Sequence, residues 1–289
     1  SYYENQTSFV GYFNDYIVYQ KQFSNSNAVI PGEGLAKDFK TSSYDYGVGY
    51  GMISLNLLQR KNYFINMQFG HGKNFFGDGY RSMFLSDFTP SYPFAKFNVG
   101  SKKWQYVCMY SLFKNITTDS ASNDWNSGWQ QKAGTFHYLS YFINKSINLS
   151  FFESTIWQPA EYAGHKFHPD ILNPLPLVHA AEFGLQGKNN TMIGLNVLYK
   201  VFDKIHLYGQ VAVDHFSISR HHRPENRYGL QAGFELFEAA GIKNLNLQTE
   251  YNQANPYTYA HYSPIVSYTH YNQPLAHPMG ANFRESVSI

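Results

Sequence analysis

Charged residues are scarce in this chain of 289 residues. Asp, Glu, Lys and Arg make up only 15% of it, whereas about a quarter is usual in a soluble domain. The 22 Lys and Arg nearly balance the 20 Asp and Glu, which leaves a formal net charge of +2. No stretch gathers Lys and Arg into a basic patch, and so weak a field does not attract a polyanion. We therefore expect no nucleic-acid partner.

Cysteines and long hydrophobic runs are also lacking. Cys108 is the single cysteine, so no disulfide can form within the chain, and the small disulfide-stapled secreted class is excluded. The mean hydropathy is −0.41, and no run of about 18 apolar residues is present that would cross a bilayer as a helix. A bundle of membrane helices is therefore excluded.

Aromatic residues and alternating patterns are abundant instead. Tyr, Phe and Trp make up 18% of the chain, beside 22 Gly. Apolar and polar residues alternate with period two in many segments, which predicts strands with two chemically different faces. The clearest apolar series are Tyr44, Tyr46, Val48, Tyr50, Met52; Tyr63, Ile65, Met67, Phe69; Trp104, Tyr106, Cys108, Tyr110, Leu112; Ile193, Leu195, Val197, Tyr199; Leu207, Val211, Val213; Leu230, Phe234; and Leu247, Tyr251. The first two series predict a hairpin.

The residues between these apolar positions favour a membrane barrel. They are mostly Gly, Asn, Gln and Ser, which suit a crowded, wet lumen better than open solvent. The apolar face, with Tyr, Phe or Trp near its ends, suits a hydrocarbon band and its headgroups. Only a closed barrel satisfies every backbone amide in lipid. We predict an all-β fold, a transmembrane antiparallel β-barrel of the bacterial outer membrane with about ten to twelve strands. The alternative is a soluble aromatic-rich β-sandwich or β-solenoid.

The chain is expected to form a single β-barrel domain over residues 1–289. Residues 70–95 and 157–190 are long, rich in Gly, Pro and His, and not periodic. Loops of this length are usually functional or fold inward as a plug. The final residues Ser286–Ile289 resemble the start of a strand, so we expect a fragment of a larger barrel, incomplete at both ends.

The most specific motif is Gly70-His71-Gly72-Lys73-Asn74-Phe75-Phe76-Gly77-Asp78-Gly79-Tyr80-Arg81-Ser82, followed by Asp87. Its glycines allow tight turns and close backbone approach, but the Walker order of Gly, Lys and Ser or Thr is absent. Buried charges persist only when paired. We therefore expect Lys73, Asp78, Arg81 and Asp87 to form a buried ion network that ties an inward loop to the barrel wall. Direct contact of the motif with a ligand is the alternative, and its site residues are His71, Lys73, Asn74, Asp78, Arg81 and Asp87.

Other chemistry-bearing residues give weaker signals. Aromatic rings in or beside polar loops can stack on sugars or lie in the interfacial belt, and the candidates are Trp125, Trp129, Trp157 and Tyr162. The histidines His165, His168, His221 and His222 lack the ligand pattern of a zinc site, so no metal and no cofactor is expected. Asp214, Glu235 and Glu250 alternate onto lumen faces, but nothing sets the spacing of about 5–10 Å that glycoside hydrolysis needs. We expect no enzymatic activity and no catalytic residue.

The motif also carries a resemblance. The run GHGKNFFGDGYRSMFLSDFTPSYPF, with Pro31-Gly32-Glu33-Gly34, Leu172-Asn173-Pro174 and Leu275-Ala276-His277-Pro278, resembles the Wzi-like capsule-assembly family, most closely its RemB gliding-motility branch. The resemblance implies an outer-membrane barrel that anchors or helps assemble a capsule-type polysaccharide in a lectin-like way. It also leaves open a structural subunit of a secretion or gliding-motility complex without a sugar ligand. The expected partners are the lipid bilayer with its lipopolysaccharide, a surface polysaccharide and other outer-membrane proteins.

Overall fold

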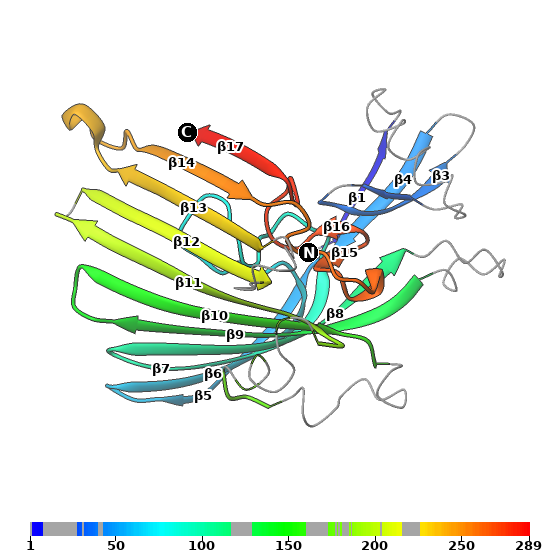
Figure 1. Ribbon diagram of the computed structural model, residues 1–289, viewed down its shortest axis with the longest axis horizontal. Coiled ribbons are helices and arrows are strands. Elements are labelled where there is room, and N and C mark those ends of the chain that lie inside the picture. Colours follow the sequence, from blue (N-terminus) through cyan, green and yellow to red (C-terminus); the bar gives the residue numbers. More distant parts are fainter. Residues whose placement is uncertain are drawn as a thin grey trace, which may run out of the picture.

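The chain folds around one large antiparallel sheet of 11 strands (Figure 1). The computed structural model describes residues 2–7, 28–30, 32–39, 43–116, 129–159, 173–176, 178, 180, 185, 187–202, 204–215 and 226–289. The strands of the large sheet, in chain order, are β5 (Gly51–Gln59), β6 (Tyr63–Gly72), β7 (Tyr92–Ser101), β8 (Trp104–Ile116), β9 (Trp129–Phe142), β10 (Ile147–Trp157), β11 (Asn190–Val201), β12 (Ile205–His215), β13 (Arg227–Leu236), β14 (Leu247–Ala254) and β17 (Phe283–Ser288). The predicted all-β class is confirmed, and no helix in the described part is long and apolar enough to span a membrane.

Each strand pairs with its neighbours in the chain, and β14 pairs with β17. The predicted hairpin is confirmed as β5 and β6. Short connections join β5 to β6, β7 to β8, β9 to β10 and β11 to β12, and they lie together at the left of Figure 1. We call this side the turn end. Segments 73–91 and 255–282 leave from the opposite side, the loop end. The sheet is curved, and within the described residues β5 and β17 remain its two edges.

Smaller elements lie beside the large sheet. A 4-stranded sheet has the order β1-β4-β3-β2. Its strands are β1 (Tyr2–Thr7), β2 (Ala28–Ile30), β3 (Gly34–Phe39) and β4 (Ser43–Gly49). The inner segment 255–282 contains the 3-10 turn η3 (Pro264–Val266), β15 (Thr269–His270) and β16 (Gln273–Pro274), while η2 (Ala239–Gly241) lies between β13 and β14.

The alternation of the sequence corresponds to the two faces of the sheet. In β12, Tyr208, Gln210 and Asp214 are buried, whereas Leu207 and Val211 are exposed. The same parity holds in β11, where Asn196 is buried between exposed Leu195 and Val197. The polar series therefore lies on the inner, concave face and the apolar series on the outer face, as the period of two predicts.

The prediction that the series from Tyr44 to Met52 lies on the outer face was wrong. Val48 is buried rather than exposed, and Met52 is paired with Gly70, on the inner side of β6. The outer face of β5 instead carries Ile53 and Leu55, which are paired with Phe69 and Met67. Neighbouring residues of a strand point to opposite faces. The series that begins at Tyr44 therefore reaches the inner face at Met52, while the residues one position further along lie on the outer face.

The outer face itself has two halves. Toward the loop end, its polar residues are buried, namely Thr135, His137, Glu153, Thr155 and Thr191. Two described residues from a distant part of the chain contact this half: Ala180 N donates to Glu153 Oε1 at 2.8 Å, and Tyr106 Oη donates to the Pro174 carbonyl. Cys108, on this face with Tyr106 and Tyr110, is also buried. The prediction that the whole Trp104–Leu112 series faces lipid therefore needs correction, because its middle lies beneath protein.

The hydrophobic core lies inside the curve of the sheet. Segments 73–91 and 255–282 fold onto the inner face near the loop end, and their apolar side chains pack against those of the strands. This core contains Phe76, Met83, Phe84 and Leu85 of the first segment, Tyr259, Ile265, Tyr268 and Leu275 of the second, and Met109, Phe113, Phe136, Phe152 and Met192 of the strands. The interior at the loop end is therefore filled with side chains.

Candidate functional site: an inner loop docked on a polar ladder

The glycine-rich motif is divided between two strands and the loop that joins them. Gly70, His71 and Gly72 belong to β6, and they pair with Phe94, Pro93 and Tyr92 of β7. The loop itself covers residues 73–91, so it is shorter at both ends than the predicted range of 70–95. Gly70 is needed in the strand because a Cβ atom there would lie 2.5 Å from the Gly51 carbonyl oxygen.

A row of polar side chains crosses the inner face beneath this loop. We call it the polar ladder, and its members face one another in register on successive strands: Ser140, Ser150, Asn196, Gln210, Gln231, Asn252 and Glu285. Neighbours are hydrogen-bonded, with Gln210 Nε2 donating to Asn196 Oδ1 at 3.2 Å and Gln231 Nε2 donating to Asn252 Oδ1 at 3.0 Å. Because most of these groups are buried, such pairing offsets the loss of their water contacts.

Glu250 of β14 holds the turn of the loop. Its carboxylate accepts the backbone N–H of Tyr80 at 2.8 Å and that of Arg81 at 3.1 Å. It also accepts Tyr208 Oη at 2.9 Å and Asn252 Nδ2 at 2.7 Å. A Cβ atom at Gly79 would lie 2.4 Å from Glu250 Oε2, so glycine there allows the backbone to reach the carboxylate. Hydrogen bonds to a charged acceptor are the stronger ones, so this is the main polar attachment of the loop.

Members of the ladder bind the loop at further points. Gln210 Oε1 accepts Met83 N–H at 2.8 Å, and Gln231 Nε2 donates to the Arg81 carbonyl at 2.9 Å. Asn196 Nδ2 donates to Asp78 Oδ2 at 2.5 Å. These amide side chains satisfy backbone groups that would otherwise be buried without partners.

Aromatic packing completes the docking of the loop. The ring of Phe84 stacks on Phe152 of β10, with ring centroids 4.7 Å apart. A Cβ atom at Gly194 of β11 would lie 2.3 Å from Phe84 Cε1, so this glycine makes room for the ring. The second inner segment covers the loop, because Tyr259 Oη donates to the Met83 carbonyl at 3.0 Å.

The six residues predicted in the motif do not form one cluster. Asp78 binds Asn196, while Arg81 approaches Glu285 at 3.9 Å. Lys73 Nζ donates to the Gly32 carbonyl at 2.7 Å, and Asp87 is exposed. The expected buried ion network of Lys73, Asp78, Arg81 and Asp87 is therefore not formed. The physical reason is that the loop attaches mainly through its own backbone groups, which amide side chains and Glu250 can satisfy.

The other two motif residues lie apart from these contacts. Asn74 is buried, with its N–H bonded to Tyr92 Oη at 3.2 Å and its Oδ1 accepting Lys96 Nζ at 3.0 Å. His71 is exposed, and its Nδ1 lies 2.9 Å from the Gly49 carbonyl oxygen at the sheet edge. Partial burial lowers the pKa of Lys73, and the nearby Glu33 and Asp87 carboxylates oppose this by favouring the charged ammonium.

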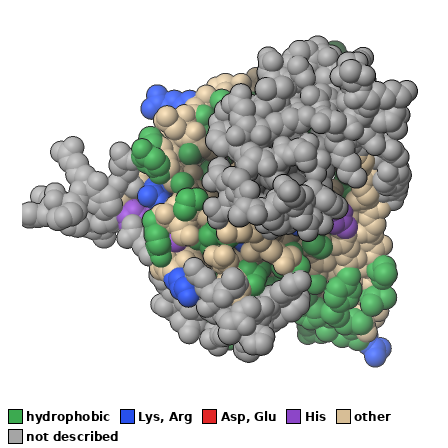
Figure 2. Space-filling view, turned by 90° about the vertical axis from the view of Figure 1, so that its right-hand side faces the viewer, with side chains coloured by type: hydrophobic (Ala, Val, Ile, Leu, Met, Phe, Trp, Pro, Cys, Tyr) green, Lys and Arg blue, Asp and Glu red, His purple; other side chains and the backbone are tan. Residues whose placement is uncertain are grey.

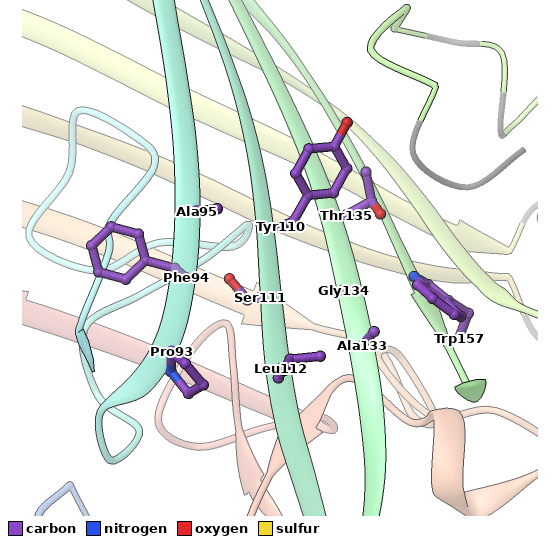
Figure 3. Close-up of a pocket in the computed structure, with 10 residues that line it drawn as sticks. All are labelled: Pro93, Phe94, Ala95, Tyr110, Ser111, Leu112, Ala133, Gly134, Thr135 and Trp157. Carbon is purple, nitrogen blue, oxygen red and sulfur yellow. The ribbon is translucent and has the colours of Figure 1, made fainter. Parts of the chain in front are cut away.

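The aromatic residues proposed for sugar stacking are only partly within the described residues. Trp125, Tyr162 and the side chain of Trp129 lie outside them. Trp157 is 2% exposed, and its ring borders an apolar cavity of ≈ 190 Å³ on the outer face, shown in Figure 3. Pro93, Leu112 and Ala133 line the same cavity from β7, β8 and β9. The part of the Trp157 ring at this cavity is the part a ligand can reach.

The inner-face carboxylates considered for hydrolysis are held by separate partners. Glu250 is bonded to the loop, Asp214 Oδ2 accepts Tyr259 N–H at 3.0 Å, and Glu235 lies 3.8 Å from His206 Nδ1. The described residues contain no group of three or more His, Cys, Asp or Glu side chains arranged for a metal. His165, His168, His221 and His222 lie outside the described residues. Of these three carboxylates, Glu250 holds the docked loop, and Asp214 is bonded to the second inner segment.

From the sequence alone, the residues that hold the loop could be recognised only as positions on the polar face of their strands. The alternation places Gln210, Gln231, Glu250 and Asn252 on the polar face, but it does not give the register between strands. A usable signal was the repeated Asn or Gln at mid-strand in four consecutive predicted strands, at Asn196, Gln210, Gln231 and Asn252. Polar side chains at matching heights predict a hydrogen-bonded row.

Comparisons with known proteins found no match among family models, curated proteins or solved structures.

Proposed function

We propose that this chain forms part of a β-barrel in a bacterial outer membrane, with its interior blocked by the inner loop, and that it holds a capsule-type polysaccharide at the cell surface without catalysing a reaction. The proposal has three parts, namely the membrane location, the blocked interior and the polymer. Each has its own support.

The exposed apolar band on the outer face supports the membrane location, and this observation carries the proposal. Large hydrophobic side chains are exposed on the outer face of β5, β6, β9, β11, β12, β13 and β14: Leu55, Phe69, Tyr141, Leu195, Val197, Tyr199, Leu207, Val211, Phe234, Leu247 and Tyr251. Leu195 is 44% exposed, although it lies in the middle of a strand. Exposed apolar surface of this extent marks a contact with membrane or protein, and apolar bands on the outer face of strands are typical of outer-membrane barrels.

The two ends of the sheet support one orientation in the membrane. Short connections gather at the turn end and long segments at the loop end, as in barrels whose short turns face the periplasm. The turn end carries Lys102, Lys103, Lys145 and Lys200 around one surface hollow, beside the exposed rings of Tyr141 and Phe142. Rings and lysines together suit the headgroup region of a bilayer. The loop end would then face the cell exterior, and Figure 2 shows hydrophobic, basic and His side chains on this side.

The position of the docked loop supports the proposal that the interior is blocked. Segments 73–91 and 255–282 fill the concave side at the loop end, and Glu250 and the polar ladder bind the first of them. A barrel built in this way is a scaffold rather than a diffusion pore. The soluble sandwich alternative would need a second layer over the exposed apolar band, and the described residues place no such layer there.

The proposal of a polysaccharide ligand rests on two observations. The loop motif resembles the Wzi-like family, and the long loops gather at one end, where scaffolds usually carry their binding surfaces. Deletion of the gene tests it. Polysaccharide released from the cell surface into the medium, with neighbouring membrane proteins unchanged, is the expected result. The second candidate is a structural subunit of a secretion or motility complex. A stoichiometric complex purified with this chain, with normal retention of polysaccharide in the deletion strain, would favour that candidate.

A further inference from the structure

A polar cavity lies at the loop end of the inner face, apart from the docked loop. It has a volume of ≈ 200 Å³ and is lined by Leu185, Asn190, Asp214, His215, Arg227, Ala260, His261 and Tyr262. These residues come from the loop ends of β11, β12 and β13 and from the inner segment 255–282, together with Leu185. A water molecule occupies about 30 Å³ of liquid, so the cavity has room for one sugar-sized ring rather than an extended chain.

The walls of this cavity are fixed by the backbone around them. Asp214 Oδ2 accepts Tyr259 N–H at 3.0 Å, and Arg227 Nη1 donates to the Ala260 carbonyl at 2.8 Å. His261 Nε2 lies 3.1 Å from the Gly187 carbonyl oxygen, and its Nδ1 accepts Ser263 N–H at 3.1 Å. A site held in this way loses little conformational entropy when a ligand enters.

Asn190 is the residue that points to a ligand. It is 2% exposed and lies on the inner side of β11, in the lining of the cavity. Among the described residues, its Nδ2 group has no hydrogen-bond partner. A buried amide donor without an acceptor is unfavourable, so an acceptor in the cavity would satisfy it.

The lining of the cavity offers both a hydrogen-bond donor and a hydrogen-bond acceptor. Asn190 offers N–H groups, and the Asp214 carboxylate offers acceptor oxygens. A hydroxyl group both accepts and donates, so neighbouring hydroxyls on one ring match both residues. The Arg227 guanidinium lies in the same lining, where its Nη1 already donates to the Ala260 carbonyl at 2.8 Å. Tyr262, at the rim, is 73% exposed and contacts His261 with ring centroids 4.0 Å apart, which leaves an aromatic surface for the C–H face of a sugar.

We propose that this cavity binds one neutral sugar residue of a surface polysaccharide through its hydroxyl groups, with Asn190 and Asp214 as the hydrogen-bonding residues and Tyr262 as the stacking ring. The identity of the polymer rests on the proposed function. The assignment of this cavity as the binding site rests on the geometry of its lining residues.

The experiment measures binding of purified full-length chain in detergent to an array of bacterial capsular and O-antigen polysaccharides. Asn190→Leu removes the donor at similar size, and Tyr262→Ala changes only an exposed rim residue, so its folding is secure. Asn66→Leu is the matched control, because Asn66 lies on the inner side of β6 near the turn end and bonds Ser54 and Asn56. The expected result is at least a tenfold loss of affinity for a neutral polysaccharide with Asn190→Leu, a several-fold loss with Tyr262→Ala, and no loss with Asn66→Leu.

The possible failures are distinguishable. If the wild-type chain binds a polysaccharide and both cavity variants bind it equally well, the cavity assignment is overturned and the proposed function stands. If the wild-type chain binds no polysaccharide on the array, the sugar proposal fails for the cavity and for the whole chain together.

Discussion

Single residues of the inner face determine where the glycine-rich loop lies. Glu250 concentrates several donors on one carboxylate, including two backbone N–H groups of the loop. The charged residues of the motif itself contribute less, since Asp78 has an amide partner and Asp87 is exposed. The carboxylate that holds the loop therefore belongs to a strand of the sheet, and the groups that it binds are mainly backbone N–H groups of the loop.

Glu250→Ala tests this assignment. The substitution leaves the N–H groups of Tyr80 and Arg81 without their acceptor, and buried donors of this kind cost roughly 2–4 kcal/mol in the folded state. We expect faster hydrogen exchange at these amides and easier proteolysis within 73–91. Glu235→Ala is the control, since Glu235 is half-buried and lies 3.8 Å from His206 Nδ1 rather than against the loop. Equal protection of the loop in Glu250→Ala and wild type would contradict the account.

The inner histidines predict a dependence on pH. Burial lowers the pKa of His277 to about 4, although the Glu285 carboxylate favours its charged form. Burial and the nearby Lys132 lower the pKa of His270 to about 3. Both folded values lie below the unfolded value of 6.5, so the unfolded state binds more protons as the pH falls. The stability that these two histidines contribute is therefore full above pH 6.5 and is lost between pH 6.5 and about 4 for His277 and between pH 6.5 and about 3 for His270.

Thermal unfolding in detergent between pH 7.5 and 4.5 measures this loss. We expect it to be roughly 5 kcal/mol at the acid end, because each of the two histidines contributes about 1.4 kcal/mol per pH unit below its unfolded pKa. The double variant His270→Gln and His277→Gln removes both groups, so its unfolding temperature should change less across the same range. A wild-type chain whose stability stays flat or rises as the pH falls through this range would show that these histidines are not buried in neutral form.

At the scale of elements, strands and their faces were predictable and the docking of segments was not. Period-two alternation gave the faces of β11, β12, β13 and β14, because a strand exposes its side chains alternately whatever its neighbours do. It failed at Met52, where the series starting at Tyr44 does not remain on the outer face. The burial of His137 and Glu153 on the outer face also has no local signal, because it depends on a segment distant in the chain that covers them.

In the candidate site, too, local features could be predicted from the sequence and long-range contacts could not. The motif predicted an inward loop from its glycines, but the ion network was wrong because partners were sought within the motif. The ladder residues lie on different strands far along the chain, and only the register of the sheet brings Gln210, Gln231 and Asn252 into one row.

Gly194→Ala tests the contact between the loop and β11. The added methyl group would lie 2.3 Å from Phe84 Cε1, so the ring must move off Phe152 or the loop must shift. Overpacking of this kind costs roughly 1–3 kcal/mol. We expect a lower unfolding temperature together with weaker protection of residues 82–86. Gly49→Ala is the control, because nothing lies within 4 Å of a Cβ atom there; similar effects from both substitutions would argue against specific packing of Phe84.

At the scale of the whole molecule, the curved sheet carries exposed apolar side chains on its outer face, and its concave side is filled with side chains at the loop end. A filled interior predicts little ion current. In planar bilayers we expect the natural full-length protein to conduct weakly, and replacement of residues 75–90 by a short Gly-Ser linker to raise the conductance severalfold. Large, steady currents from the unaltered protein would contradict the blocked interior and favour a diffusion porin.

The central claim is that the outer apolar band contacts lipid acyl chains, and spin labels on β11 test it most directly. In a Cys108→Ser background reconstituted in lipid vesicles, single cysteines are placed at Leu195, Val197 and Tyr199 on the outer face and at Leu198 and Lys200 on the inner face. The account predicts that labels on the outer face are relaxed by oxygen dissolved in the bilayer, and labels on the inner face by a water-soluble nickel complex. Outer labels that respond mainly to the nickel complex, or to neither reagent because protein covers them, would contradict it.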